Sequence, residues 1–127
     1  MSRLAAAACL LALSASLARG LDCANPATTA DMITCGGRDL DAADRELNQV
    51  YDETMGLVRK RAADWPEAAG NLRAAQRAWV VFRDANCTWV AGAMEGGTGQ
   101  PVLEISCRSE MTRARTKELR ETAKPYR

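Results

Sequence analysis

The segment Leu72–Cys87 (LRAAQRAWVVFRDANC) constrains the fold most, because its apolar residues keep a helical period for longer than those of any other segment. At about 100° per residue, the apolar side chains of this segment and of the residues after it fall within one broad arc of a helix. An apolar face of this width predicts a middle helix that packs against two neighbours. The arc contains Leu72, Ala75, Ala78, Trp79, Phe82, Ala85, Trp89 and Val90.

Three polar residues, Gln76, Arg83 and Asn86, lie inside the same arc. An unpaired polar group in a core costs free energy, so buried polar groups are normally hydrogen-bonded. We therefore expect these three side chains to form buried hydrogen bonds with neighbouring helices.

Residues 1–20 have the pattern of a secretory signal peptide, in which Arg3 precedes a short apolar run and small residues follow. We predict cleavage after Gly20, with cleavage after Ala18 as the alternative, so that residues 21–127 form one domain. The apolar run is too short to span a bilayer, and no second run follows it. Cys9 lies too early in the peptide for a lipoprotein signal. The sequence thus predicts a periplasmic or secreted protein without a lipid anchor or transmembrane segment.

Four cysteines remain after cleavage, namely Cys23, Cys35, Cys87 and Cys107. An even number of cysteines in an exported chain predicts a disulfide framework. Zinc binding is not expected, because the chain has no histidine and no C-x-x-C pair.

A short helical element is expected at the start of the mature domain. Thr28 or Thr29 caps it, it runs through Cys35, and Gly36-Gly37 ends it.

Three longer helices follow this element, and no segment alternates as a strand would. The first is capped by Asp39 or Asp41, and Trp65-Pro66 separates it from the second. A Gly-rich connector, residues 92–101, leads to the third. The expected limits are about 39–63, 66–94 and 102–122. The fold class is therefore all-α: a small antiparallel three-helix bundle with a short N-terminal helical element and two disulfides.

Short connections predict antiparallel neighbours, which gives a test of the register between helices. Folding the second helix back at Trp65-Pro66 brings Asp44 near Arg83, so we expect an ion pair between them. Folding the third helix back brings Cys87 near Cys107, which predicts a Cys87–Cys107 bridge. A Cys23–Cys35 bridge then follows by elimination. In the chain-entropy model each bridge stabilises the fold by about 3 kcal/mol.

Charge is unevenly distributed along the mature chain. Residues 22–58 carry eight acids and two bases, a net charge of −6, whereas residues 59–127 carry thirteen bases and eight acids, a net charge of +5. We expect the two parts to attract each other as they pack. The overall charge of −1 after cleavage argues against a nucleic-acid binder, which needs a basic face.

The mature chain contains four spaced motifs, in this order: C-x11-C, D-x2-LN-x2-Y, L-x3-QRAW-x3-RD-x2-C and C-x4-T-x2-R-x3-L. This pattern resembles the lysozyme inhibitor LprI N-terminal domain family of exported bacterial proteins. The resemblance implies a small, Cys-containing helical domain and inhibition of lysozyme. We assign the matched residues to the scaffold, as core and as buried polar links. They are Asp44, Leu47, Asn48, Tyr51, Gln76, Trp79, Arg83, Asp84, Thr112, Arg115 and Leu119.

The leading functional hypothesis is a cell-envelope protein that blocks a lysozyme, of the c-type for example, by protein–protein contact. Lysozymes are generally cationic, so acidic residues of the first long helix would steer the inhibitor towards the enzyme. The candidate contacts are Asp39, Asp41 and Glu46, with Glu95 of the Gly-rich connector as a residue that plugs the cleft.

The sequence argues against an enzyme, because without histidine the usual general base is missing. No carboxylate pair stands out for glycoside hydrolysis, and no catalytic, cofactor-binding or metal-binding residues are expected. The alternative function is a structural or assembly module of the envelope without lysozyme activity. Val80 and Val81 would begin an apolar patch for such a contact. The sequence leaves the oligomeric state open.

Overall fold

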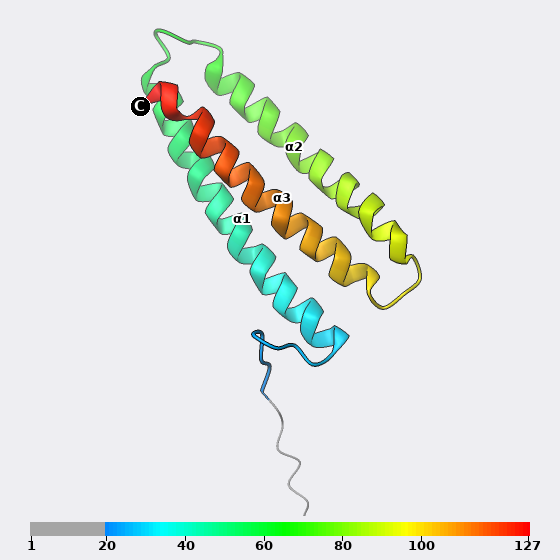
Figure 1. The fold of residues 1–127 in the computed structure, drawn as a ribbon. Helices are drawn as coiled ribbons and strands as arrows, with labels where there is room; N and C mark the ends of the chain where they lie inside the picture. Colours follow the sequence, from blue (N-terminus) through cyan, green and yellow to red (C-terminus); the bar gives the residue numbers. More distant parts are fainter. Residues whose placement is uncertain (1–19) are drawn as a thin grey trace, which may run out of the picture.

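Three long helices form the part of the chain that the computed structural model describes, residues 20–127 (Figure 1). No strand occurs among these residues, and the predicted all-α bundle is confirmed. The predicted signal peptide lies, except for Gly20, outside the described residues. The elements are α1 (Thr29–Lys60), α2 (Ala68–Ala91), the 3-10 turn η1 (Gly92–Met94), α3 (Gln100–Thr122) and the 3-10 turn η2 (Lys124–Tyr126).

α1 begins at a capping box formed by Thr28 and Asp31. The Asp31 backbone N–H donates to Thr28 Oγ1 at 3.1 Å, and the Thr28 N–H donates to Asp31 Oδ2 at 3.1 Å. Two backbone donors that the helix leaves unpaired are thereby satisfied. Of the two expected caps, Thr28 is the one used.

The expected helix break at Gly36-Gly37 does not exist, because α1 continues through both glycines. The short N-terminal element is therefore the first part of α1, and Asp39 and Asp41 lie inside the helix instead of capping it. Packing explains Gly36: a Cβ atom there would lie 3.0 Å from Ile105 Cγ2 of α3. Gly36 lets α1 and α3 approach closely. In the sequence alone, a glycine in this role cannot be distinguished from one that ends a helix.

α3 is the middle helix, and the expectation that the second helix would be the middle one is wrong. Figure 1 shows α3 between α1 and α2, and α1 and α2 touch each other little. α1 and α3 run in the same direction, and α2 runs against both. The close α1–α3 contact is made by small hydroxyl residues of α3, since Ser109, Thr112 and Thr116 are all buried.

The apolar core lies between α1 and α3 and is closed on one side by α2. Leu47, Val50 and Leu119 form its buried cluster. Tyr51, Leu72 and Trp79 pack against this cluster and are partly buried.

α2 buries a different side from the one expected. Its fully buried residues are Cys87 and Ala91. Phe82 and Trp89, which were expected to point inward, are 59% and 77% exposed, and Ala78 and Ala85 are exposed as well. The reason is that α2 has its main neighbour, α3, on one side only.

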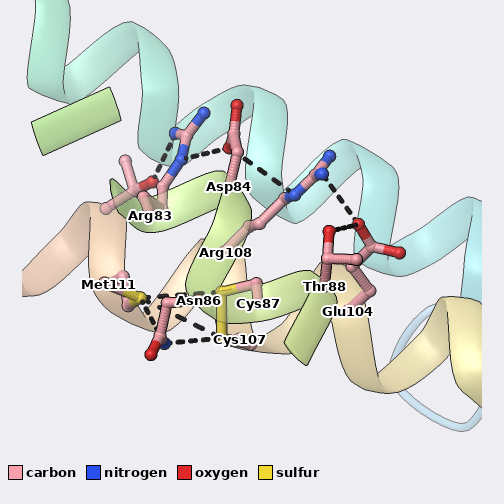
Figure 2. The surroundings of a disulfide bond; sticks show 10 residues. Arg83, Asp84, Asn86, Cys87, Thr88, Glu104, Cys107, Arg108 and Met111 are labelled. Carbon is pink, nitrogen blue, oxygen red and sulfur yellow. Dashed lines mark hydrogen bonds and ion pairs between the residues drawn. A yellow bond between two sulfur atoms is a disulfide. The ribbon is translucent and has the colours of Figure 1, made fainter. Parts of the chain in front are cut away.

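Both predicted disulfides are confirmed. Cys23–Cys35 ties the N-terminal segment to α1, and Cys87–Cys107 joins α2 to α3, with Cα atoms 5.4 and 5.5 Å apart. In Figure 2, Met111 lies beside the second bridge, and Asn86 Nδ2 is 3.3 Å from Met111 Sδ.

Candidate functional site

A polar layer connects all three helices halfway along the bundle. Arg83 of α2 donates from one terminal nitrogen to Asp44 Oδ1 of α1 at 2.8 Å and to Thr112 Oγ1 of α3 at 3.0 Å. Its Nε donates to Asp84 Oδ1 at 3.0 Å (Figure 2). The predicted Asp44–Arg83 pair is therefore present, and it explains why an arginine lies inside an apolar arc.

Trp79 lies between two arginines on the inner side of α2. The guanidinium carbons of Arg83 and Arg115 are 5.3 and 6.0 Å from the centre of its ring. Arg115 Nε also donates to Gln76 Oε1 at 3.1 Å. Both guanidinium groups are partly desolvated against the Trp79 ring, and a cation–π interaction of this kind stabilises a fold by about 0.5–2 kcal/mol.

Further polar contacts join α2 to α3 beside the disulfide. Thr88 Oγ1 donates to Glu104 Oε1 at 3.1 Å, and Arg108 donates to Glu104 Oε1 at 2.7 Å (Figure 2). Arg108 also lies 3.6 Å from Asp84. Polar contacts and the disulfide thus add to the apolar contacts that hold α2 to α3.

The structure brings the motif residues together with one exception. Leu47 and Leu119 are in the core, and Asn48 is exposed on α1. The others lie in or next to the polar layer or pack against the core, namely Asp44, Tyr51, Gln76, Trp79, Arg83, Asp84, Thr112 and Arg115. A scaffold role for the motif residues stays a prediction; exposed Asn48 has no core contact that supports it.

The polar layer also divides the charges of the molecule. We call the part on the side of the α1 N-terminus and the α2–α3 turn the acidic end, comprising residues 20–43 and 84–111. It carries eight acids and two bases, a net charge of −6. The part beyond the layer, the basic end, comprises residues 45–82 and 113–127 and carries seven acids and twelve bases, a net charge of +5. The nearly neutral chain therefore has strong charge separation along its length.

An apolar hollow of about 270 Å³ opens at the acidic end. It lies where α1 meets the α2–α3 turn, and its lining includes Met32, Met94, Val102 and Leu103. Met32 and Met94 are largely exposed at its rim. Methionine is flexible and polarizable, which suits an adaptable protein-binding surface.

The four candidate contact residues divide into two pairs. Asp39 and Glu46 form ion pairs with Arg113 and Arg120 of α3, the second at 2.7 Å, so their charges are partly neutralised. Asp41 and Glu95 are exposed and form no ion pair among residues 20–127. Asp39, Asp41 and Glu95 share the acidic end, whereas Glu46 lies beyond the polar layer.

The Gly-rich connector is a compact turn held by its own hydrogen bonds. The Gly97 N–H donates to the Met94 carbonyl at 2.9 Å, and the Gly96 N–H donates to Gln100 Oε1 at 3.2 Å. Gly96 has a φ of 75°, a conformation that favours glycine. The turn places Glu95 on a short exposed corner beside the apolar hollow.

A second, larger hollow of about 590 Å³ lies at the basic end, where the α1–α2 turn meets the C-terminus. Sequence reasoning treated Trp65 only as part of a helix stop and did not foresee this hollow. Trp65 meets Tyr126 edge-on with ring centres 5.2 Å apart, and the Arg61 guanidinium lies 5.1 Å from the Trp65 ring. On the nearby surface, the Lys124 ammonium lowers the pKa of the Glu121 carboxyl below its usual range.

The described residues contain neither a group of three or more side chains arranged to hold a metal ion nor a helix long and apolar enough to cross a membrane.

Comparisons with known proteins give these features a family context. Residues 23–119 match the family model described as Lysozyme inhibitor LprI. An uncharacterized protein of Rhizobium meliloti is 36% identical over 110 residues, which cover 79% of this chain and 77% of that protein. Lipoprotein LprI of Mycobacterium tuberculosis is 32% identical over 72 residues, which cover 57% of this chain and 32% of the lipoprotein. The aligned part is therefore about a third of the mycobacterial protein.

The fold itself also has a solved relative. The crystal structure of a DUF1311 family protein from Pseudomonas putida KT2440 matches with a TM-score of 0.68 at 26% sequence identity. The match covers 76% of this chain and 94% of that chain.

Proposed function

Because this chain belongs to the lysozyme inhibitor LprI family, we propose that it is an exported cell-envelope protein that inhibits a lysozyme by direct contact. The contact surface is the acidic end, and the charge separation across the polar layer is the observation that carries this assignment. Lysozymes are generally cationic, and an end with a net charge of −6 attracts and orients such a partner. The family description is that of an inhibitor, so the proposal involves no catalytic step.

The acidic end combines the two features that a specific protein contact needs. Asp41 and Glu95 supply charge that no ion pair within the described chain neutralises. The hollow beside them, with Met32 and Met94 at its rim, supplies apolar area for the centre of the contact. Glu95 occupies the corner of a compact turn, which limits the conformational entropy lost on binding.

The proposal is tested by lysis of bacterial cells by a c-type lysozyme, with the purified, oxidised chain added in increasing amounts. We expect dose-dependent protection of the cells. A reduced and alkylated sample is the control for the fold, because both disulfides hold the helices of the acidic end. Absence of protection at a large excess over lysozyme would refute lysozyme inhibition.

The binding surface is tested by two charge-reversal variants with the same change in net charge. Asp41→Lys with Glu95→Lys reverses free acids of the acidic end, and Asp52→Lys with Glu67→Lys reverses exposed acids of the basic end. We expect the first variant to weaken lysozyme binding by at least about tenfold and the second by much less, because only the first faces the enzyme. Isothermal titration calorimetry measures both. Equal losses would mean that net charge alone steers binding and that the acidic end is not the contact surface.

The second candidate function is an assembly module of the envelope without lysozyme activity. The exposed apolar residues of α2, Val81 and Trp89 among them, favour it because such residues commonly mark protein contacts. Capture of one stable partner from an envelope extract, together with absence of lysozyme protection, would support this function over inhibition.

A further inference from the structure

α2 exposes an apolar face that no part of the described chain covers. Val81, Phe82 and Trp89 are 71%, 59% and 77% exposed on it. Helical spacing places these residues on the side of α2 opposite buried Cys87 and Ala91. We call this set the α2 outer face; it consists of Ala74, Ala78, Val81, Phe82, Ala85 and Trp89.

The width of the apolar arc in the sequence now has an explanation. α2 has two apolar sides, one against α3 and one free. On the free side, Ala85 separates the aromatic residues Phe82 and Trp89, and no charged residue belongs to that side. Aromatic side chains bury large areas on association and are enriched at the centres of interfaces. An uncovered face of this kind indicates a binding partner.

The outer face is symmetric about the point between Val81 and Phe82. Its six residues form three pairs whose residue numbers add up to 163: Ala74 with Trp89, Ala78 with Ala85, and Val81 with Phe82. When two helices pack antiparallel about a two-fold axis, residues with a constant sum of numbers lie opposite each other. Trp89 of one helix then lies over Ala74 of the other. Ala78 lies opposite Ala85, and these two small side chains allow the helices to approach closely.

We propose that the α2 outer face is the interface of a homodimer in which the α2 helices of two copies pack antiparallel. A cationic partner such as a lysozyme fits this face less well than the acidic end, because the face itself contains no acid. The inference is independent of the proposed lysozyme contact, which uses the acidic end.

Charge at the edge of the face favours the antiparallel direction. Arg77 is exposed and has no ion pair among the described residues. In the antiparallel pairing, Arg77 of one copy lies about 3 Å along the axis from the level of Asp84 of the other. The Asp84 side chain is 43% exposed, so it can accept this contact while keeping Arg83. In a parallel two-fold pair the edges that carry Arg77 and Asp84 would lie on opposite sides of the contact, so the two side chains would not meet.

The charge separation of the whole molecule favours the same direction. Antiparallel packing places the acidic end of one copy, with a net charge of −6, beside the basic end of the other, with a net charge of +5. The α2 helix dipoles are then also opposed, which is the favourable arrangement for neighbouring helices. The two acidic ends point in opposite directions and both stay accessible.

Sedimentation equilibrium of the oxidised mature chain tests the dimer. A contact between two single helices belongs to the small interfaces, below about 1,200 Å², so we expect a dimer that dissociates on dilution. Phe82→Glu and Trp89→Glu should each raise the dimer dissociation constant by at least about tenfold, because each buries a charge in the contact. Met32→Glu, a similar change at an exposed residue of α1, should change it by less than about twofold.

The exposure of Phe82 and Trp89 in the single chain predicts that these variants fold normally, which circular dichroism verifies. A chain that stays monomeric up to about 1 mM would overturn the proposal. So would a dimer whose dissociation constant is unchanged by Phe82→Glu and Trp89→Glu.

Disulfide cross-linking tests the direction and the register. Ala78→Cys in one chain and Ala85→Cys in another lie opposite each other in the proposed dimer, so a mixture should cross-link on mild oxidation. Each variant alone should not, because identical positions lie seven residues, about 10.5 Å, out of register, too far for a disulfide. Cross-linking of Ala78→Cys to itself as readily as in the mixture would contradict the antiparallel arrangement.

Discussion

Replacing Arg83 by methionine tests whether the polar layer holds the bundle together. The change keeps an unbranched apolar stem but removes the three hydrogen bonds to Asp44, Thr112 and Asp84. It also removes the cation that lies 5.3 Å from the centre of the Trp79 ring. The Arg83 side chain is only 11% exposed, so these contacts replace most of the water that would surround it in the unfolded chain.

The size of the effect follows from the exposure of the partners. Each hydrogen bond to a charged group contributes about 1.5–3 kcal/mol, and breaking a buried ion pair costs about 3–5 kcal/mol. The carboxylates of Asp44 and Asp84 are 39% and 43% exposed and regain water when Arg83 is removed. We therefore expect a loss near the lower limit, about 3 kcal/mol in the free energy of unfolding. For a domain of this size that loss lowers Tm by roughly 10–20 °C.

Urea denaturation measures the loss, with far-UV circular dichroism and tryptophan fluorescence as probes. Arg73→Met is the matched control, because Arg73 is exposed on the same helix and has no ion pair within residues 20–127; its effect should stay within about 0.5 kcal/mol. In a double-mutant cycle with Asp44→Asn we expect a coupling energy of about 1–2 kcal/mol. A loss for Arg83→Met no larger than for Arg73→Met, or a coupling near zero, would refute the structural role of the layer.

The remaining predictions concern the glycines, the second disulfide and pH. Gly37→Ala should stabilise the chain by about 0.5–1 kcal/mol in thermal melts, because a Cβ there meets nothing within 4 Å and alanine favours helix. Gly36→Ala should be at least about 1 kcal/mol less stable than Gly37→Ala, because its Cβ would press on α3; equal stabilities would show that the helices do not approach closely there. Replacing Cys87 and Cys107 together by alanine should cost about 3 kcal/mol in urea denaturation, the entropy of the loop they close, and a loss below about 1 kcal/mol would contradict this. Because the chain has no histidine, Tm should change little between about pH 6 and 8. The lowered pKa of Glu121 makes a contribution that is present above its unfolded pKa and lost as pH falls through its folded pKa, so Glu121→Gln should reduce the loss of Tm on acidification; an unchanged acid profile would contradict this.

The sequence was sufficient to predict the features that depend on distance along the chain. Helical periodicity and two short turns determine which residues of consecutive helices lie at the same height along the bundle. The Asp44–Arg83 pair and the Cys87–Cys107 bridge, each between residues far apart in sequence, follow from this register. The four candidate contact residues are only partly brought together, because Glu46 lies beyond the polar layer. Asp39 and Glu46 also form ion pairs with arginines of α3, which the charge pattern along the chain did not reveal.

The sequence did not reveal which side of each helix is covered. Thr116 of α3 is buried although it is polar, because its hydroxyl donates to the Thr112 carbonyl at 2.9 Å within the same helix. Such internal hydrogen bonds let a polar-looking helix become the middle one. Conversely, Phe82 and Trp89 have the periodicity of core residues and remain exposed.

The sequence by itself therefore determined the all-α class, the register between consecutive helices and the disulfide pairing, because these depend on local periodicity and loop length. The resemblance to the family came from the spacing of particular residues along the chain. Only the tertiary structure decided that α3 is the middle helix, that Gly36 is a packing residue, and that charge separates into two ends. The physical reason is that periodicity shows that a helix face is apolar, whereas the arrangement of neighbouring helices decides whether that face is buried or left for another molecule.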